Sequence, residues 1–247
     1  MIQENGLIKT KYMKTVIMVQ ARMGSTRLPG KILKNIDEKN NVLDFLLNQL
    51  NYSKKIDEII IATTKNREDD VIEEFSRKRK IECFRGEEND VLNRYYQTAK
   101  KYSVDNIIRI TSDNPLIDPE YIDKGLDIFL SKKLDLLSTS ESNTFPYGVV
   151  FEIISFSAIE KISKKELSNF EKEHVTSFFY SNQDKFKIYS YIFENNVSNI
   201  RCSIDTLNDL IFVRELLKKI ENRPVIVSDI IEVTSRFPEL LDINNKN

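Results

Sequence analysis

Short apolar runs alternate with longer amphipathic stretches through the first half of the chain. The runs are four or five residues long, as is typical of buried strands, and the stretches between them carry apolar residues at helical spacing. The segment Asp118-Pro119-Glu120 has the pattern of a helix N-terminus and predicts a further helix there. This alternation predicts an α/β fold with a mainly parallel sheet and helices on both faces. The predicted strands are residues 15–19, 58–62, 81–84, 107–110 and 134–137, and the predicted helices are residues 41–50, 67–80 and 90–102.

The second half of the chain is less regular. Residues 149–154 and 187–193 have the pattern of strands that belong to a different, antiparallel part. Helices are expected at residues 166–182, at residues 206–220 and from residue 228 toward residue 236. No linker rich in Gly, Pro or Ser and no internal repeat divides this half from the first.

Length and composition fit a single α/β domain. With 247 residues, 40% of them apolar and 30% charged, the chain can form and cover one core. We place the domain at residues 14–243, with a flexible extension at residues 1–13 and a tail at residues 244–247. The net charge of −1 gives no overall field for nucleic acid or an anionic membrane, so neither is expected as a partner.

Two further features bear on the cellular compartment. No apolar run approaches the roughly 20 residues that a membrane-spanning helix needs, and residues 1–14 lack the apolar region of a signal peptide. Cys83 and Cys202 are far apart in sequence and lack metal-ligand spacing, which favours two reduced thiols over a disulfide. These features favour a cytoplasmic enzyme.

The loop at residues 21–31 is the strongest candidate for chemistry. It leaves the carboxyl end of the first predicted strand and holds three cations, two glycines and two hydroxyl side chains. Glycines let backbone N–H groups approach an anion, and Arg22, Arg27 and Lys31 can neutralise it. The loop has neither the G-x-x-x-x-G-K-[ST] pattern of a Walker P-loop nor the G-x-G-x-x-G pattern of a dinucleotide site. Its interleaved small and cationic residues favour a polyphosphate site over an ordinary surface loop.

Two aspartates follow other apolar runs. Asp113, just past the strand at residues 107–110, is well placed to hold a divalent metal ion, although Asp113-Asn114-Pro115 is also a good turn sequence. Asp205 precedes a predicted helix, so its local interpretation is a helix cap, a role that Thr206 would serve equally. The residues alone leave these alternatives open.

The loop, A-R-M-G-S-T-R-L-P-G-K, resembles the signature loop of nucleotidyltransferases that activate sugars. Among these, the chain resembles the CMP-sugar-acid synthetases, which are the acylneuraminate and 3-deoxy-manno-octulosonate cytidylyltransferases. Within that family it is most similar to the branch of the spore coat polysaccharide biosynthesis protein F. The resemblance spans about residues 14–237. It implies a three-layer sandwich like that of nucleotide-diphospho-sugar transferases, GT-A-like and Rossmann-like, with a small antiparallel insertion.

The resemblance also implies roles for individual residues. The segment R-I-T-S-D-N-P-L-I resembles the family's G-D-x-P-L pattern, with Ser112 in place of Gly, and S-I-D-T-L-N-D resembles V-D-T-x-x-D. These segments make Asp113 and Asp205 the ligands of Mg²⁺, which prefers oxygen donors. The catalytic residues would be Arg22, Lys31, Asp113 and Asp205. The nucleotide would be bound in the loop by Ala21, Arg22, Gly24, Ser25, Arg27 and Lys31, and around the base and ribose by Ala62, Thr63, Gly86 and Asp90.

Two later motifs resemble the acceptor side of the family's site. F-P-Y-G-V-V-F-E is similar to P-x-G-x-x-x-E, and E-K-E-H-V is similar to [DR]-E-H-V. Val150-Phe151 stands where many relatives have Asp-Val, which leaves the identity of the acceptor open. The family often dimerises through this subregion, here about residues 147–193, and a homodimer is one assembly that the resemblance implies. The acceptor-binding residues would be Tyr147, Gly148, Glu152 and His174.

The predicted activity is Mg²⁺-dependent transfer of CMP from CTP to a sugar acid or sugar-like acceptor, with release of pyrophosphate, for a surface polysaccharide or glycan. In such a transfer the protein holds the triphosphate in line and neutralises developing charge. One alternative is a guanylyl- or uridylyltransferase that acts on a sugar 1-phosphate. A glycosyltransferase of the same architecture is disfavoured because Asp113 and Asp205 are not in D-x-D motifs. A catalytically silent nucleotide-binding subunit is disfavoured because Lys31 and both aspartates are present.

Overall fold

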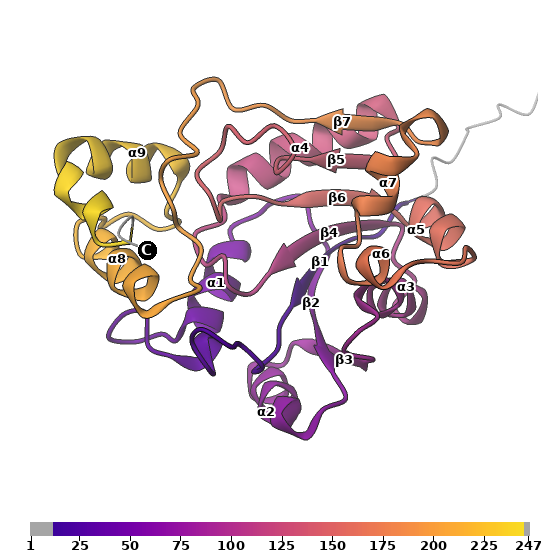
Figure 1. Ribbon diagram of the computed structural model, residues 1–247, viewed down its shortest axis with the longest axis horizontal. Coiled ribbons are helices and arrows are strands. Elements are labelled where there is room, and N and C mark those ends of the chain that lie inside the picture. Colours follow the sequence, from indigo (N-terminus) through magenta and orange to yellow (C-terminus); the bar gives the residue numbers. More distant parts are fainter. Residues whose placement is uncertain (1–11, 245–247) are drawn as a thin grey trace, which may run out of the picture.

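The computed structural model describes residues 12–244, so the predicted extension lies mostly outside the described residues, as do residues 245–247. The strands form one sheet in the order β3-β2-β1-β4-β6-β5-β7, which Figure 1 shows from the bottom to the top of the view. The strands are β1 (Thr15–Gln20), β2 (Glu58–Thr64), β3 (Glu82–Gly86), β4 (Asn106–Thr111), β5 (Leu136–Ser138), β6 (Glu152–Ser155) and β7 (Ile188–Ser190).

The sheet is mainly parallel, as predicted. β1 lies between β2 and β4 and is parallel to both, with Val19 opposite Ile61 on one side and Ile110 on the other. β6 enters between β4 and β5 and is antiparallel to both, while β7 is parallel to β5. The predicted antiparallel part is confirmed for residues 149–154, which contain most of β6, but the prediction is wrong for residues 187–193, because β7 is parallel to β5. Both strands join the same sheet. β6 pairs with β4 on one edge and with β5 on the other, and β7 pairs with the outer edge of β5.

Several helices begin at residues with capping side chains. Asn41, Asp90, Asp118 and Thr206 each accept a hydrogen bond from a backbone N–H of the helix that follows, which satisfies a group with no partner inside the helix. The helices are α1 (Val42–Leu50), α2 (Asp70–Arg79), α3 (Val91–Lys101), α4 (Pro119–Lys132), α5 (Phe156–Ser163), α6 (Asn169–Glu173), α7 (Ser177–Ser181), α8 (Leu207–Leu217) and α9 (Val227–Arg236).

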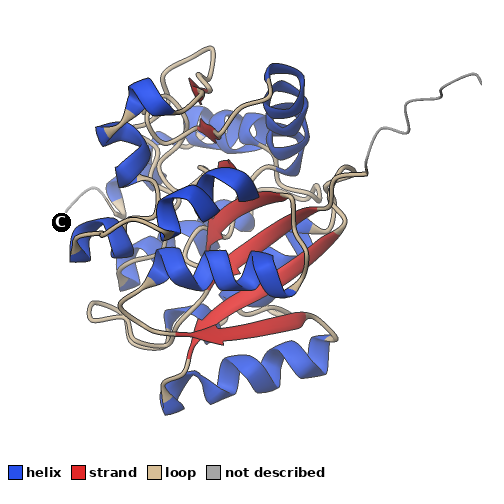
Figure 2. Ribbon diagram, turned by 90° about the vertical axis from the view of Figure 1, so that its right-hand side faces the viewer, coloured by secondary structure: helices blue, strands red, loops and turns tan. Residues whose placement is uncertain are grey.

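Different helices cover the two faces of the sheet, because side chains alternate along each strand. Ile17 and Val19 of β1 lie in a core with α1, α2 and α4, whereas Val16 and Met18 lie in a core with α3, α5 and α7. Figure 2 shows helices on either side of the strands. A further core, which includes Ile204, is built by α8 and α9, and Figure 1 shows these two helices together beside one end of the sheet. The predicted three-layer sandwich is confirmed.

The helix predicted at residues 166–182 is wrong, because two short helices, α6 and α7, replace it. Between them, Val175 is fully buried in the core with α3 and α5, and the Thr176 hydroxyl donates to Glu152 Oε1 at 2.8 Å. These tertiary contacts draw the chain inward and interrupt the helix. α7 then carries Phe179 into the same core, so this aromatic side chain is part of the domain interior.

The last described residues pack against the domain. Asn244, which the sequence assigned to the tail, is 3% exposed, and its amide donates to Arg201 O at 3.0 Å and to Asp209 Oδ1 at 3.2 Å. Cys83 and Cys202 are free thiols, as predicted. Among residues 12–244, no helix has both the length and the apolar character that crossing a membrane requires.

Candidate active site

The loop after β1 folds back on itself. Its beginning is held by Asp69, whose carboxylate accepts hydrogen bonds from Met23 N at 2.7 Å and from the Thr64 hydroxyl. Its end is turned by Gly30, which has a φ of +65°, in the left-handed region that favours glycine. Lys31 therefore opens the 3-10 turn that follows with its side chain directed back toward the sheet.

A cavity of about 260 Å³ lies between this loop and the carboxyl ends of β1 and β4. In parallel α/β sheets, ligands bind at such strand ends. The structure therefore brings the predicted phosphate ligands and both predicted metal ligands to one place. The predicted site residues that line this cavity are Arg22, Gly24, Ser25, Arg27, Lys31, Asp113 and Asp205.

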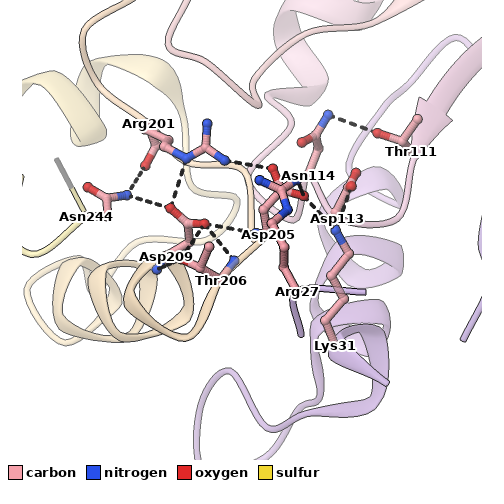
Figure 3. A network of polar contacts seen from close by, with 10 residues as sticks. All are labelled: Arg27, Lys31, Thr111, Asp113, Asn114, Arg201, Asp205, Thr206, Asp209 and Asn244. Carbon is pink, nitrogen blue, oxygen red and sulfur yellow. Dashed lines mark hydrogen bonds and ion pairs between the residues drawn. The ribbon is translucent and has the colours of Figure 1, made fainter. Parts of the chain in front are cut away.

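Lys31 connects the two aspartates (Figure 3). Its ammonium nitrogen lies 2.8 Å from Asp113 Oδ2 and 3.0 Å from Asp205 Oδ1. A backbone hydrogen bond of 2.8 Å from Ile204 N to Asp113 O ties the two aspartate-bearing segments together. Thr206 caps α8, and its hydroxyl accepts a hydrogen bond from a backbone N–H of that helix. The side chain of Asp205 is therefore not needed as the cap and lines the cavity.

Ser112 takes the place of the glycine in the G-D-x-P-L pattern that this segment resembles. Its backbone N–H donates to Gln20 O at 3.0 Å, which ties the turn after β4 to the end of β1. Ser112 does not have a positive φ, so its Cβ is tolerated without backbone strain. Below it, the Asn114 amide donates to the Thr111 hydroxyl at 3.1 Å and closes the turn that presents Asp113.

Arg201 holds Asp205 on the side away from Lys31, as Figure 3 shows. One guanidinium nitrogen, Nη2, lies 2.7 Å from Asp205 Oδ2, and Nε lies 2.9 Å from Oδ1 of the buried Asp209. Arg27 approaches the other oxygen of Asp205, Oδ1, at 3.0 Å. Because Arg201 occupies Oδ2, Asp205 offers Oδ1 to cations in the cavity.

The surrounding cations keep these carboxylates ionised. Burial would raise the pKa of Asp205, but the hydrogen bond and charge of Lys31, together with the charges of the neighbouring arginines, lower that pKa below its ordinary value. Burial would also raise the pKa of Asp209, but its hydrogen bonds with Arg201 and Thr206 lower that pKa below its ordinary value. Both groups are therefore charged at neutral pH.

The donor set at the cavity suits a hard divalent cation. Asp113 and Asp205 direct carboxylate oxygens at one position, which the Lys31 ammonium takes. Mg²⁺ is commonly held by one or two carboxylates together with substrate phosphates and water. Within the described part of the chain, no group of three or more His, Cys, Asp or Glu side chains is arranged to hold a metal ion. Phosphate and water oxygens would therefore have to complete the coordination.

The residues expected around the base and ribose lie at the carboxyl ends of β2 and β3. Ala62 and Thr63 are buried in β2, and Ala62 O accepts a hydrogen bond of 3.3 Å from Ala21 N. Gly86 ends β3, and Asp90 caps α3 at the end of the connecting segment. These backbone positions border the loop.

Arg22 links the loop to the segment after β3. Its Nη1 lies 3.0 Å from Glu88 Oε1, and Glu88 Oε2 accepts a hydrogen bond of 2.7 Å from the Asn66 amide. Arg22 is half-exposed and lines the cavity, so its guanidinium is available to an anion that competes with Glu88.

Two of the predicted acceptor residues lie beside the Asp205 segment. The ring of Tyr147 is 4.7 Å from the Arg201 guanidinium carbon. Gly148 has a φ of +90°, and a Cβ there would lie 2.3 Å from Ser203 N. Only glycine can bring this backbone so close to the segment that carries Asp205.

The other two predicted acceptor residues lie elsewhere. Glu152 is buried in β6, where Oε2 is 2.7 Å from Arg109 Nη1 and Oε1 accepts from Thr176, so both oxygens have partners inside the fold. His174 is exposed just after α6, with its ring 4.4 Å from that of Phe170. Contact of Glu152 and His174 with an acceptor stays a prediction.

Three residues of the site carried no role in the sequence interpretation. Asp69 accepts from Met23, 46 positions away, and Glu88 contacts Arg22 and Asn66, 66 and 22 positions away, so no local pattern marks these contacts. Arg201 had a visible signal, since Asp205 and Asp209 follow it at intervals of four residues.

Comparison with known proteins places this site in a family. Residues 16–228 match the family model described as cytidylyltransferase. The chain belongs to the cytidylyltransferase family. This family membership makes the chain a nucleotidyltransferase and confirms the predicted resemblance.

Two relatives and one solved structure illustrate the breadth of this cytidylyltransferase family. The uncharacterized protein MJ1063 of Methanocaldococcus jannaschii is 37% identical over 238 residues, which cover 94% of this chain and 95% of that protein. The spore coat polysaccharide biosynthesis protein SpsF of Bacillus subtilis is 30% identical over 232 residues, which cover 91% of this chain and 95% of that protein. The structure of a cytidylyltransferase from Leptospira borgpetersenii superposes with a TM-score of 0.89 at 35% identity. The superposition covers 93% of this chain and 97% of that chain.

Proposed function

We propose that this protein transfers CMP from CTP to a sugar acid or sugar-like acceptor and releases pyrophosphate. The observation that carries the proposal is the convergence of Lys31, Asp113 and Asp205 in a cavity that the β1 loop also lines. Cationic loop residues suit the triphosphate, and paired carboxylates suit its divalent metal ion. An acceptor oxygen would attack the α-phosphorus, and the bond from that phosphorus to the bridging oxygen of pyrophosphate would break.

The loop would bind and orient the triphosphate. Arg22, Arg27 and Lys31 are each held by carboxylates of the protein, at 3.0 Å, 3.0 Å and 2.8–3.0 Å respectively. Phosphate oxygens would exchange with these carboxylates as partners. The backbone N–H groups and hydroxyls near Gly24 and Ser25 would supply further donors, so that charge which develops on the leaving pyrophosphate is neutralised.

Asp113 and Asp205 would hold Mg²⁺ against the phosphates. When bound, the ion supplies charge neutralisation at the reacting phosphorus and orients the triphosphate. Arg201 would keep Asp205 in place by holding Oδ2, so that Oδ1 alone is offered to the ion. Lys31, whose ammonium lies between the two carboxylates, would pair with phosphate oxygens of the bound triphosphate.

The acceptor would approach beside Tyr147 and Gly148, which lie next to the Asp205 segment. The relation to SpsF, a spore coat polysaccharide biosynthesis protein, supports an acceptor that is destined for a surface polysaccharide or glycan. A homodimer formed through residues 147–193 and a cytoplasmic location complete the proposal, and analytical ultracentrifugation tests the dimer.

The first experiment compares the thermal stabilisation of the protein by CTP, GTP, UTP and ATP in the presence of Mg²⁺. Ligand binding stabilises the folded state by about 2.7 kcal/mol at a hundredfold excess over Kd, so CTP should raise the melting temperature most. A larger shift with GTP or UTP would contradict the cytidylyl assignment. Pyrophosphate release from CTP in the presence of sugar acids then tests the reaction itself.

A further inference from the structure

Asp69 occupies the position that commonly caps a helix, but its side chain does not cap α2. It immediately precedes α2, and aspartate is among the residues most favoured at such a position. Among the described residues, its carboxylate accepts no hydrogen bond from the first turn of the helix. Oδ1 instead accepts from Met23 N at 2.7 Å and Oδ2 accepts from the Thr64 hydroxyl, and Asp69 is fully buried. A buried carboxylate is thus directed at the loop after β1.

Met23 is the residue at which this loop closes on itself. Its carbonyl oxygen accepts hydrogen bonds from Ser25 N at 2.8 Å and from Gly30 N at 3.3 Å. Its methyl group would lie 3.3 Å from a Cβ at Gly30, so the side chain packs against the same turn. Gly30 directly precedes Lys31, whose side chain lines the cavity. A contact that holds Met23 therefore holds both the beginning and the end of the loop.

The connection between β2 and α2, which carries Asp69, is itself held by β3. Arg85 of β3 donates from Nε to Thr64 O and from Nη2 to Asn66 O, both at 2.8 Å. The Thr64 hydroxyl accepts from Asn66 N at 3.1 Å and donates to Asp69. Because a hydroxyl has a single hydrogen to donate, this bond orients the carboxylate. Asp69 therefore approaches the loop from a firmly bonded support.

The negative charge of Asp69 has a buried positive charge near it. Arg94 of α3 is 2% exposed, and its stem packs where a Cβ at Gly86 would lie 3.0 Å from Arg94 Cγ. Burial lowers the pKa of the Arg94 guanidinium, and the charges of Asp69 and Glu88 act on that pKa in the opposite sense. Solvent screens the attraction between two buried groups only weakly. The carboxylate beneath the loop is therefore compensated within the fold.

We propose that Asp69 is a positioning residue of the triphosphate site, which acts through Met23 to hold the loop in the conformation that binds the anion. The inference rests on the proposed nucleotidyl transfer and adds a residue that does not itself line the cavity. A mobile loop loses conformational entropy when it binds a ligand, and a loop that is already fixed loses less. Loss of the Asp69 charge should therefore weaken triphosphate binding although every cationic side chain of the loop remains.

A purely structural role for Asp69 makes a different prediction. If the carboxylate only satisfied Met23 N and the Thr64 hydroxyl, its loss would lower the melting temperature and leave the affinity of the folded protein unchanged. The positioning role requires a change in the loop of the folded protein. The Met23 methyl group reports on that loop because it packs against Gly30, and Met18, which is fully buried in β1, is an internal reference.

The first measurement is NMR of the full chain labelled with carbon-13 at its methionine methyl groups. Asp69→Asn keeps the shape of the side chain and removes its charge. Asp70→Asn is the matched control, because it makes the same change one residue later, at an exposed carboxylate that pairs with Arg85. Without ligand, the Met23 resonance should shift or narrow in Asp69→Asn alone. The Met18 resonance should stay that of the wild type in both variants.

The second measurement is calorimetric titration of the same proteins with inorganic tripolyphosphate and with α,β-methylene-CTP, each with Mg²⁺. Wild type and Asp70→Asn should bind each probe with equal affinity. Asp69→Asn should bind each about 10-fold more weakly, as expected when a charge-assisted hydrogen bond is lost. If Asp69→Asn does not fold, Thr64→Val, which removes the hydroxyl that orients the carboxylate, takes its place with the same expectations.

Wild-type affinity in the folded Asp69 or Thr64 variant, an unchanged Met23 resonance, or an equal loss of affinity in Asp70→Asn would overturn the inference. Failure of the wild type to bind either probe would count against the proposed function, and the inference would be overturned with it. The two failures are distinguishable because the first requires a wild type that binds.

Discussion

Lys31 and Asp205 form an ion pair of 3.0 Å although 174 positions separate them in the sequence. The same ammonium group is 2.8 Å from Asp113, so one internal cation neutralises both carboxylates. Such a cation competes with any external one for the same oxygens. Divalent metal ions should therefore bind well only when a triphosphate draws Lys31 away.

Lys31→Met keeps the aliphatic stem and removes the charge. Turnover should fall about 10²–10³-fold, because a donor to the developing charge is lost. Mn²⁺ alone, followed by electron paramagnetic resonance without nucleotide, should bind more tightly than in the wild type, since the carboxylates lose their internal counter-charge. Lys39→Met, at an exposed position, is the matched control. Unchanged Mn²⁺ affinity would show that Lys31 does not compete for these oxygens.

Asp113→Asn and Asp205→Asn each remove one carboxylate from the cavity. Each should reduce pyrophosphate release from CTP by at least about 10³-fold, because neutral amides bind Mg²⁺ poorly, while circular dichroism stays that of the wild type. Asp127→Asn, which alters a surface ion pair with Lys55, should keep full activity. Retention of wild-type turnover by either active-site variant would reject the metal role.

Gly148→Ala tests the close approach of the acceptor segment to Ser203. The new Cβ would lie 2.3 Å from a backbone nitrogen at a φ of +90°, so the free energy of unfolding should fall by about 2–4 kcal/mol in urea titrations. Gly24→Ala is the comparison, because its Cβ would meet only the tip of the flexible Glu68 side chain at 2.9 Å. Equal stability of the two variants would contradict the steric argument.

Asp209→Asn tests the ion pair between Asp209 and Arg201, the arginine that also holds Asp205. The pKa of Asp209 is lower in the folded protein than in the unfolded chain, where it is near 3.8. Ionised Asp209 therefore stabilises the fold at every pH above the pKa of the unfolded chain. This stabilisation is lost as the pH falls through the pKa of the folded protein. At pH 7 the variant should be less stable by about 2–3 kcal/mol, the cost of charged hydrogen bonds to Arg201. The difference from the wild type should narrow in urea titrations below about pH 4. A difference that stays constant with pH would refute this assignment.

Local patterns predicted the first half of the fold well. The alternation of apolar runs and amphipathic stretches located the early strands and helices, and Asp90 and Asp118 cap the helices that their sequence signals indicate. The β1 loop could be recognised because glycines and cations within one short segment have few structural uses other than binding an anion. In the second half, local patterns were weaker guides. Val175 and Thr176 interrupt a predicted helix through contacts that no local pattern contains.

The sequence by itself determined the cytidylyltransferase resemblance, the order of the early elements and the identity of the candidate ligands, because these depend on residues close together in the chain. Only the tertiary structure decided that Lys31 lies between Asp113 and Asp205 and that Glu152 forms an ion pair with Arg109 inside the fold. The physical reason is that charge pairing and burial depend on distances across the fold. Those distances are set by packing among elements far apart in the chain.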